Sequence, residues 1–167
     1  DDSALMRKMI PQLLGASHEI EVVGTAMDGL FALKKMAELK PDVVTLDVDM
    51  PRMDGIETLR RIVEQFGTPV IMVSSLTERG ATLTLQALEL GAFDFVTKPQ
   101  DAISVHIKDI GEELIAKVKA AYGNPLARLR TLKTASNAVP RVKATTRTTK
   151  TAEKVLAIGI STGGPNA

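Results

Sequence analysis

Residues 43–55 read Val-Val-Thr-Leu-Asp-Val-Asp-Met-Pro-Arg-Met-Asp-Gly, and this stretch decides the fold. Its first four residues are apolar or β-branched, a pattern typical of a strand buried on both faces of a parallel sheet. Asp47 follows directly, where the carboxyl end of a strand borders the ligand crevice of an open α/β sheet. The stretch therefore predicts a parallel sheet with a carboxylate at its crevice.

The sequence on either side of this stretch, up to about residue 122, alternates between strand and helix patterns. Short β-branched runs predict strands at 20–23, 70–73 and 93–96. Between them, apolar residues recur at helical spacing in segments that begin near residues 5, 30, 56, 85 and 107. Strands separated by helices are joined by right-handed crossovers, so we predict a doubly wound α/β domain.

Other polar side chains stand beside predicted strand ends. Asp1 and Asp2 precede the first helix, Ser74 follows one strand, and Lys98 follows another. Single aspartates often cap helices, and Asp2 could do so here. A helix cap does not explain why all these groups, with Asp47, come at strand ends in this order.

These groups together have the chemistry of an aspartyl-phosphate site. Crowded carboxylates repel one another unless a cation is present, and carboxylate oxygens suit Mg²⁺. Asp47 can then attack a phosphoryl group, while Lys98 neutralises its oxygens and Ser74 donates a hydroxyl hydrogen bond. The sequence predicts phosphoryl capture by Asp47.

Residues 1 to about 122 resemble a response-regulator receiver domain without its first strand. The resemblance implies a flavodoxin-like, five-stranded parallel sheet with phosphorylation at Asp47. It also implies Mg²⁺ at Asp2 and Asp47, with Asp1 acting through water and the Asp49 backbone carbonyl as a further ligand. Ser74, Phe95 and Lys98 would be the switch residues, although a plain core role for Phe95 stays equally open.

The end of the chain has two further segments. Residues 123–153 lose periodicity and carry seven cations and no acid between 124 and 152, so the rest of the chain, from a total of +1, carries −6. We interpret this segment as a flexible basic linker. It has no aromatic residue to stack on bases, so nucleic-acid binding is not expected. Residues 154–167 restart a strand pattern, which we take as the start of a second domain.

A possible nucleophile stands in this last segment. Residues 159–163 fit the pattern G-x-S-x-G, in which a sharp turn after a strand exposes a serine, here Ser161. A glycine-rich turn with an incidental serine explains the pattern alone equally well. The longer string 158–165 resembles the nucleophile turn of chemotaxis methylesterases, and stretches 42–47, 50–55, 72–77 and 87–99 are similar to that subfamily.

The methylesterase resemblance implies a two-domain enzyme. Such an enzyme hydrolyses glutamyl methyl esters on chemoreceptors, deamidates glutamines in many members, and receives phosphoryl groups from a chemotaxis histidine kinase. Ser161 would be its nucleophile, with histidine and aspartate partners beyond residue 167. The alternative is a non-enzymatic phospho-switch that binds protein or DNA. A helix-turn-helix module would not begin with a strand followed by Gly-Ile-Ser-Thr-Gly-Gly-Pro.

Composition limits the remaining classes. The 167 residues contain no cysteine, which excludes disulfides and thiolate metal sites. No apolar run approaches the roughly 18 residues that a membrane span needs, so membrane insertion is not expected. We expect a cytoplasmic protein, and a fragment at both ends because no strand precedes Asp1.

Overall fold

The computed structural model describes residues 4–74, 77–98 and 107–124, together with the backbone of 153–158. In chain order, the elements are α1 (Ala4–Leu14), β1 (Ile20–Ala26), α2 (Gly29–Leu39), β2 (Val43–Asp47), α3 (Gly55–Gln65), β3 (Val70–Ser74), α4 (Glu78–Glu89), β4 (Asp94–Thr97), α5 (Ile107–Tyr122) and β5 (Glu153–Ile158). The predicted alternation of strands and helices is confirmed.

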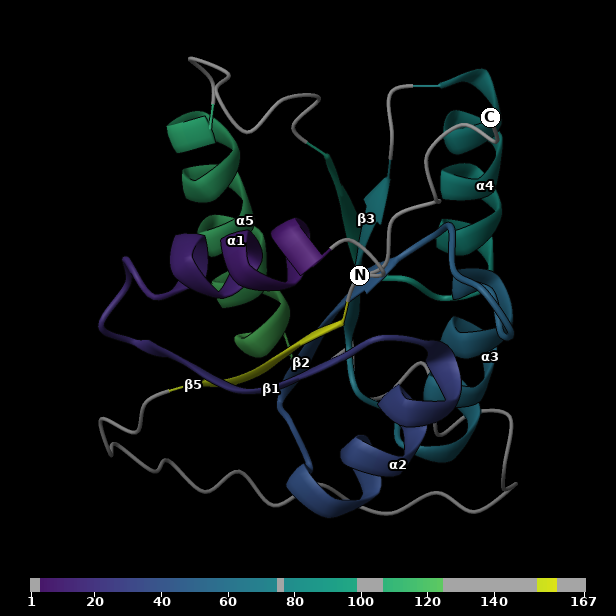
Figure 1. The fold of residues 1–167 in the computed structure, drawn as a ribbon, viewed down its shortest axis with the longest axis horizontal. Coiled ribbons are helices and arrows are strands. Elements are labelled where there is room, and N and C mark those ends of the chain that lie inside the picture. Colours follow the sequence, from purple (N-terminus) through teal and green to yellow (C-terminus); the bar gives the residue numbers. More distant parts are fainter. Residues whose placement is uncertain (1–3, 75–76, 99–106, 125–152, 159–167) are drawn as a thin grey trace.

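The five strands form one parallel sheet in the order β1-β5-β2-β3-β4. Figure 1 shows α1 and α5 on one side of this sheet and α2, α3 and α4 on the other. The doubly wound α/β fold predicted from the sequence is therefore confirmed. All five strands point the same way, so their carboxyl ends share one edge of the sheet.

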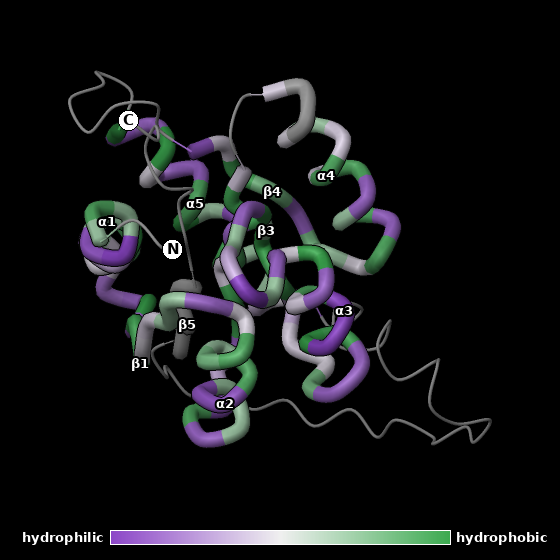
Figure 2. Tube along the Cα trace, turned by 45° about the vertical axis from the view of Figure 1, so that its right-hand side comes forward, coloured by the Kyte–Doolittle hydropathy of each residue, from purple (hydrophilic) through white to green (hydrophobic). Residues whose placement is uncertain are grey.

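Two apolar clusters hold the layers together. On one face, Leu46 and Met72 pack with the inner sides of α2, α3 and α4. On the other face, Val43 and Ile71 pack with α1 and α5. Adjacent strand residues thus enter opposite clusters, as the alternation of side chains along a strand requires. Figure 2 shows hydrophobic and hydrophilic segments alternating along α2 and α3, as expected of helices with one buried side.

Strand β5 takes the place where the sequence predicted a missing strand. Val155 pairs with Val22 and Val43, and Ile158 pairs with Ala26. A gap at the centre of a buried sheet would leave the backbone N–H and C=O groups of both neighbours without partners, and β5 satisfies them. The sheet is therefore five-stranded, as predicted, with β5 in the central place for which the sequence analysis had assigned no strand. That residues 154–167 start a second domain stays a prediction.

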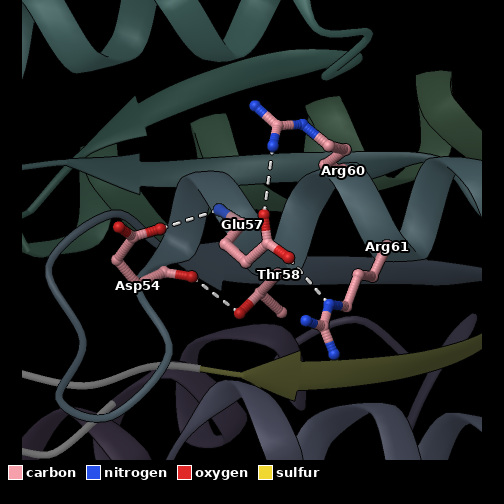
Figure 3. Close-up of polar contacts among 5 residues, drawn as sticks. All are labelled: Asp54, Glu57, Thr58, Arg60 and Arg61. Carbon is pink, nitrogen blue, oxygen red and sulfur yellow. Dashed lines mark hydrogen bonds and ion pairs between the residues drawn. The ribbon is translucent and has the colours of Figure 1, made fainter.

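Helix α3 begins immediately after the loop that follows Asp47. Asp54 is its N-cap and accepts a 2.7 Å hydrogen bond from the Glu57 N–H, while the Thr58 hydroxyl donates to the Asp54 carbonyl at 2.7 Å (Figure 3). The Glu57 carboxylate accepts from Arg60 and Arg61 at 3.2 and 2.8 Å. These local bonds fix the first turn of α3 and so the loop before it.

No helix among the described residues has the length and apolar character to cross a membrane.

Candidate functional site

Asp47 is the last residue of β2, and its side chain is only 1% exposed. The Lys98 ammonium donates to Asp47 Oδ2 at 2.6 Å, and the Asp49 backbone N–H donates to Oδ1 at 3.2 Å. Each carboxylate oxygen accepts one of these two bonds. The predicted meeting of Asp47 with Lys98 is present in the structure.

The electrostatics of Asp47 are unusual for an aspartate. Burial raises the pKa of its carboxyl from 3.8 to about 6, although Lys98 and the Asp49 N–H both act to lower it. Desolvation of the charge thus outweighs the nearby ammonium. Asp47 is mostly ionised at neutral pH, but at a free-energy cost that a bound cation would reduce.

Lys98 reaches Asp47 from the residue after β4. Its backbone N–H donates to the Ser74 carbonyl at 2.7 Å, which extends the β3–β4 ladder to the site. The Lys98 side chain is 14% exposed, so most of its stem is covered while its ammonium faces Asp47. The ladder therefore fixes the position from which the ammonium acts.

Ser74 ends β3 and is buried. Its hydroxyl donates to the Gly80 carbonyl in α4 at 3.2 Å. Thr77 caps α4 and accepts from the Gly80 N–H at 3.0 Å, so Gly80 is held at both backbone groups. The predicted switch hydroxyl is thus in contact with the first turn of α4.

The loop after Asp47 depends on Gly55. Its N–H donates to the Val48 carbonyl at 3.0 Å. An added Cβ at Gly55 would overlap the Asp47 carbonyl oxygen and lie 2.7 Å from Val48 Cα. Because both neighbours are backbone atoms, no side chain can move aside to make room. Only glycine allows α3 to start this close to Asp47.

An ion pair that the sequence analysis missed joins this loop to α2. Asp28, 1% exposed, caps α2 by accepting from the Phe31 N–H at 2.8 Å, and it also pairs with Arg52. Arg52 has a positive φ of 65°. An aspartate just before a helix pattern is a recognisable capping signal. The pairing with Arg52, 24 residues away, has no signal in the sequence.

Phe95, the predicted switch aromatic, lies on β4 and is 38% exposed, so it is not a core residue. The Lys117 ammonium lies 5.0 Å from the centre of the Phe95 ring and donates a hydrogen bond to the Phe95 backbone carbonyl at 2.5 Å. The same ammonium pairs with Asp94 and Glu113 at 3.2 and 2.9 Å. Burial lowers the pKa of Lys117, but the bonds to Glu113 and Asp94 outweigh it, and the net shift is upward.

Three predicted site residues, Asp1, Asp2 and Ser161, lie outside the described residues. Within the described ranges, no three histidine, cysteine, aspartate or glutamate side chains gather into a metal cluster. Asp47 alone of the predicted carboxylate ligands can be assessed. Its carboxylate oxygens are suitable ligands for a hard divalent cation, which needs few protein ligands and keeps several waters. The positive charge of such a cation would also offset the burial that raises the pKa of Asp47.

A family comparison agrees with this geometry. The family described as the response regulator receiver domain matches residues 1–108. The chain belongs to the response regulator receiver family. Receivers of this family generally use Mg²⁺ for phosphorylation, which agrees with the carboxylate oxygens that Asp47 offers as metal ligands.

Solved receivers share this fold. The response regulator domain of Thermotoga maritima CheB is 47% identical, with a TM-score of 0.67, and the match covers 74% of this chain and 92% of that one. The signal receiver domain of the putative response regulator NarL from Mycobacterium tuberculosis is 30% identical, with a TM-score of 0.60, over 74% of this chain and 93% of that one.

The similar proteins that match the whole chain are methylesterases that share one description. A protein-glutamate methylesterase/protein-glutamine glutaminase of Koribacter versatilis is 53% identical, and the match covers 100% of this chain and 47% of the relative. The Bacillus subtilis protein of the same description is 48% identical, over 100% of this chain and 48% of the relative. The chain thus spans about half the length of these relatives, and its similarity to them extends over residues 123–167 as well. This favours the methylesterase resemblance over the phospho-switch alternative.

Proposed function

We propose that Asp47 accepts a phosphoryl group from a chemotaxis histidine kinase. The observation that carries the proposal is the buried carboxylate of Asp47 with the Lys98 ammonium 2.6 Å from Oδ2. A buried acid with a perturbed pKa beside a specific cation is typical of functional sites. Membership of the receiver family supports the same role.

The transfer uses groups that are already in place. An Asp47 carboxylate oxygen attacks phosphorus as the bond between phosphorus and the donor imidazole nitrogen breaks. Because the other ring nitrogen of the donor carries a proton, the products are an acyl phosphate and a neutral imidazole. Lys98 is close enough to pair with the phosphoryl oxygens as their charge moves onto Asp47. Ser74, at the neighbouring strand end, can turn its hydroxyl toward one of those oxygens.

Mg²⁺ is part of this proposal. Asp47 and the Asp49 backbone carbonyl would hold it, with Asp1 and Asp2 as further carboxylates. When bound, the metal neutralises phosphoryl charge during transfer. It would also offset the desolvation that raises the pKa of Asp47.

The purpose of phosphorylation, in our proposal, is to relieve inhibition of an esterase that demethylates glutamyl sites on chemoreceptors and in some cases deamidates glutamines. Residues 1–122 would be the receiver, 123–153 the linker and 154–167 the start of the catalytic domain, with Ser161 as nucleophile. Support comes from the methylesterase relatives, which match the whole chain. A cytoplasmic location agrees with a cysteine-free sequence.

The test uses a protein of the relatives' length that contains this sequence. Acetyl phosphate and Mg²⁺ should raise its hydrolysis of methylated receptors, and Asp47→Asn should abolish the increase but keep basal activity. Asp54→Asn is the matched control, because asparagine caps a helix as well as aspartate and the stimulation should persist. Equal stimulation of wild type and Asp47→Asn would contradict the proposal.

A further inference from the structure

Two buried hydroxyl groups meet at one backbone carbonyl beside the site. The Gly80 oxygen accepts hydrogen bonds from the Ser74 hydroxyl at 3.2 Å and from the Thr84 hydroxyl at 2.7 Å. Ser74 and Thr84 are 4% and 5% exposed. Threonines in helices often bond to the carbonyl four residues earlier. The unusual feature is that a second hydroxyl, that of Ser74 at the end of β3, donates to the same Gly80 carbonyl.

We propose that Thr84 is a positioning residue for Ser74, sharing the Gly80 carbonyl so that the Ser74 hydroxyl can exchange this bond for one to a phosphoryl group on Asp47. The inference rests on the proposed function of Asp47. The Ser74 bond is the longer of the two and so the weaker. Ser74 is therefore the donor that leaves more readily.

The physical reason lies in the second lone pair of the buried Gly80 carbonyl, because the first accepts the helical hydrogen bond from the Thr84 backbone N–H. If Ser74 were the sole side-chain donor, its departure would strip the Gly80 carbonyl of that bond in a place that water does not reach. With Thr84 in place, the carbonyl keeps a short side-chain bond after Ser74 has turned. Thr84 thus lowers the cost of the rearrangement without touching the phosphoryl group.

The variant that tests this is Thr84→Val, which replaces the hydroxyl by a methyl of similar size. We expect it to weaken Mg²⁺-dependent binding of beryllofluoride, a phosphoryl mimic, by about fivefold, the worth of roughly one hydrogen bond. Thr84→Ser restores the hydroxyl and should return affinity to the wild-type value. Thr82→Val makes the same chemical change at an exposed position of α4 and should have no effect.

A second measurement tests the shared acceptor without any phosphoryl group. In urea unfolding of Ser74→Ala, Thr84→Val and the double variant, each single change leaves one side-chain donor on Gly80, whereas the double change leaves none. The unfolding equilibrium should therefore shift about threefold further in the double variant than the two single effects predict. If Thr84 stabilises the fold independently of Ser74, the effects of the two single changes on unfolding simply add in the double variant.

The outcomes separate the two proposals. Coupled unfolding together with weaker beryllofluoride binding in Thr84→Val supports the inference. Additive unfolding, or unchanged binding in Thr84→Val, overturns it. Failure of the wild-type chain to bind beryllofluoride would overturn the proposed function of Asp47, while the unfolding experiment would still decide whether Ser74 and Thr84 share the carbonyl.

Discussion

Asp47 is a charged residue in surroundings that disfavour its charge, and this gives stability a definite pH dependence. Its pKa of about 6 in the folded chain exceeds the ordinary value of 3.8, so the folded state holds the proton more tightly than the unfolded state between these values. The free energy of unfolding should therefore fall as pH rises from about 4 to about 6. The rise of this pKa from 3.8 to about 6 corresponds to a change of about 3 kcal/mol in the free energy of unfolding.

Other carboxyl groups titrate in the same range, so the comparison with Asp47→Asn isolates this one. The variant should gain stability relative to wild type as pH rises from about 4 to 6, and the gain should level off above that. Urea unfolding in EDTA at several pH values measures it. A stability difference that does not change with pH would contradict the account of Asp47.

A second residue-scale prediction concerns Gly55. Gly55→Ala places a methyl against the Asp47 carbonyl and Val48 Cα, and neither backbone atom can move without disturbing β2. We expect a loss of about 2 kcal/mol or more in the free energy of unfolding, since overpacking a rigid site is costly. Gly123→Ala, where the nearest atom would lie at 3.4 Å, should cost far less. Comparable unfolding midpoints for the two variants would show that the loop relaxes.

Strand ends explain how much of the site was predictable at this scale. Asp47 and Lys98 were brought together correctly because Asp47 ends β2, Lys98 directly follows β4, and parallel strands end at one edge. Asp28 with Arg52, and Thr84 with Ser74, were missed because loop conformation and helix position decide those pairs. Neither the conformation of a loop nor the position of a helix can be read from the periodicity of the sequence.

At the scale of elements, Lys117 links α5 to β4. Its ammonium contacts the Phe95 ring and carbonyl together with Asp94, so it connects the two elements at the exposed aromatic. Lys117→Met keeps the stem but removes the charge. We expect faster amide hydrogen exchange in β4, with β3 unchanged, because β4 is an edge strand held in part by this residue.

The control for this prediction is Lys119→Met in the same helix. Lys119 pairs with Glu19, whose side chain is 69% exposed, so solvent screens the pair and it contributes little to stability. Its removal should leave exchange in β4 as in the wild type. If Lys117→Met also leaves β4 unchanged, then Lys117 does not hold the strand, and Phe95 keeps its position without it.

At the scale of the whole molecule, the sheet depends on β5, which lies far from the other four strands in the sequence. β5 pairs with β1 on one side and β2 on the other, so a chain ending at residue 124 leaves a gap at the centre of the sheet. We expect that shortened chain to lose cooperative unfolding, followed by circular dichroism during heating. A chain ending at residue 158 keeps β5 and should unfold like the full chain. Cooperative unfolding of the shorter chain would mean that β1 and β2 do not need β5.

The sequence indicated the fold class and four of the five strands in their places, since periodicity reports which faces are buried. It did not indicate where the last strand would pair. That depends on which backbone edges are left without partners, a property of the assembled sheet and not of any local pattern.

Phosphoryl capture by Asp47 is the central claim, and mass spectrometry tests it most directly. After incubation with acetyl phosphate and Mg²⁺, the chain should gain the mass of one phosphoryl group, and borohydride reduction followed by fragmentation should locate it at Asp47. The adduct should be absent from Asp47→Asn and present in Asp54→Asn. An adduct that persists in Asp47→Asn, or no adduct in the wild type, would contradict the account.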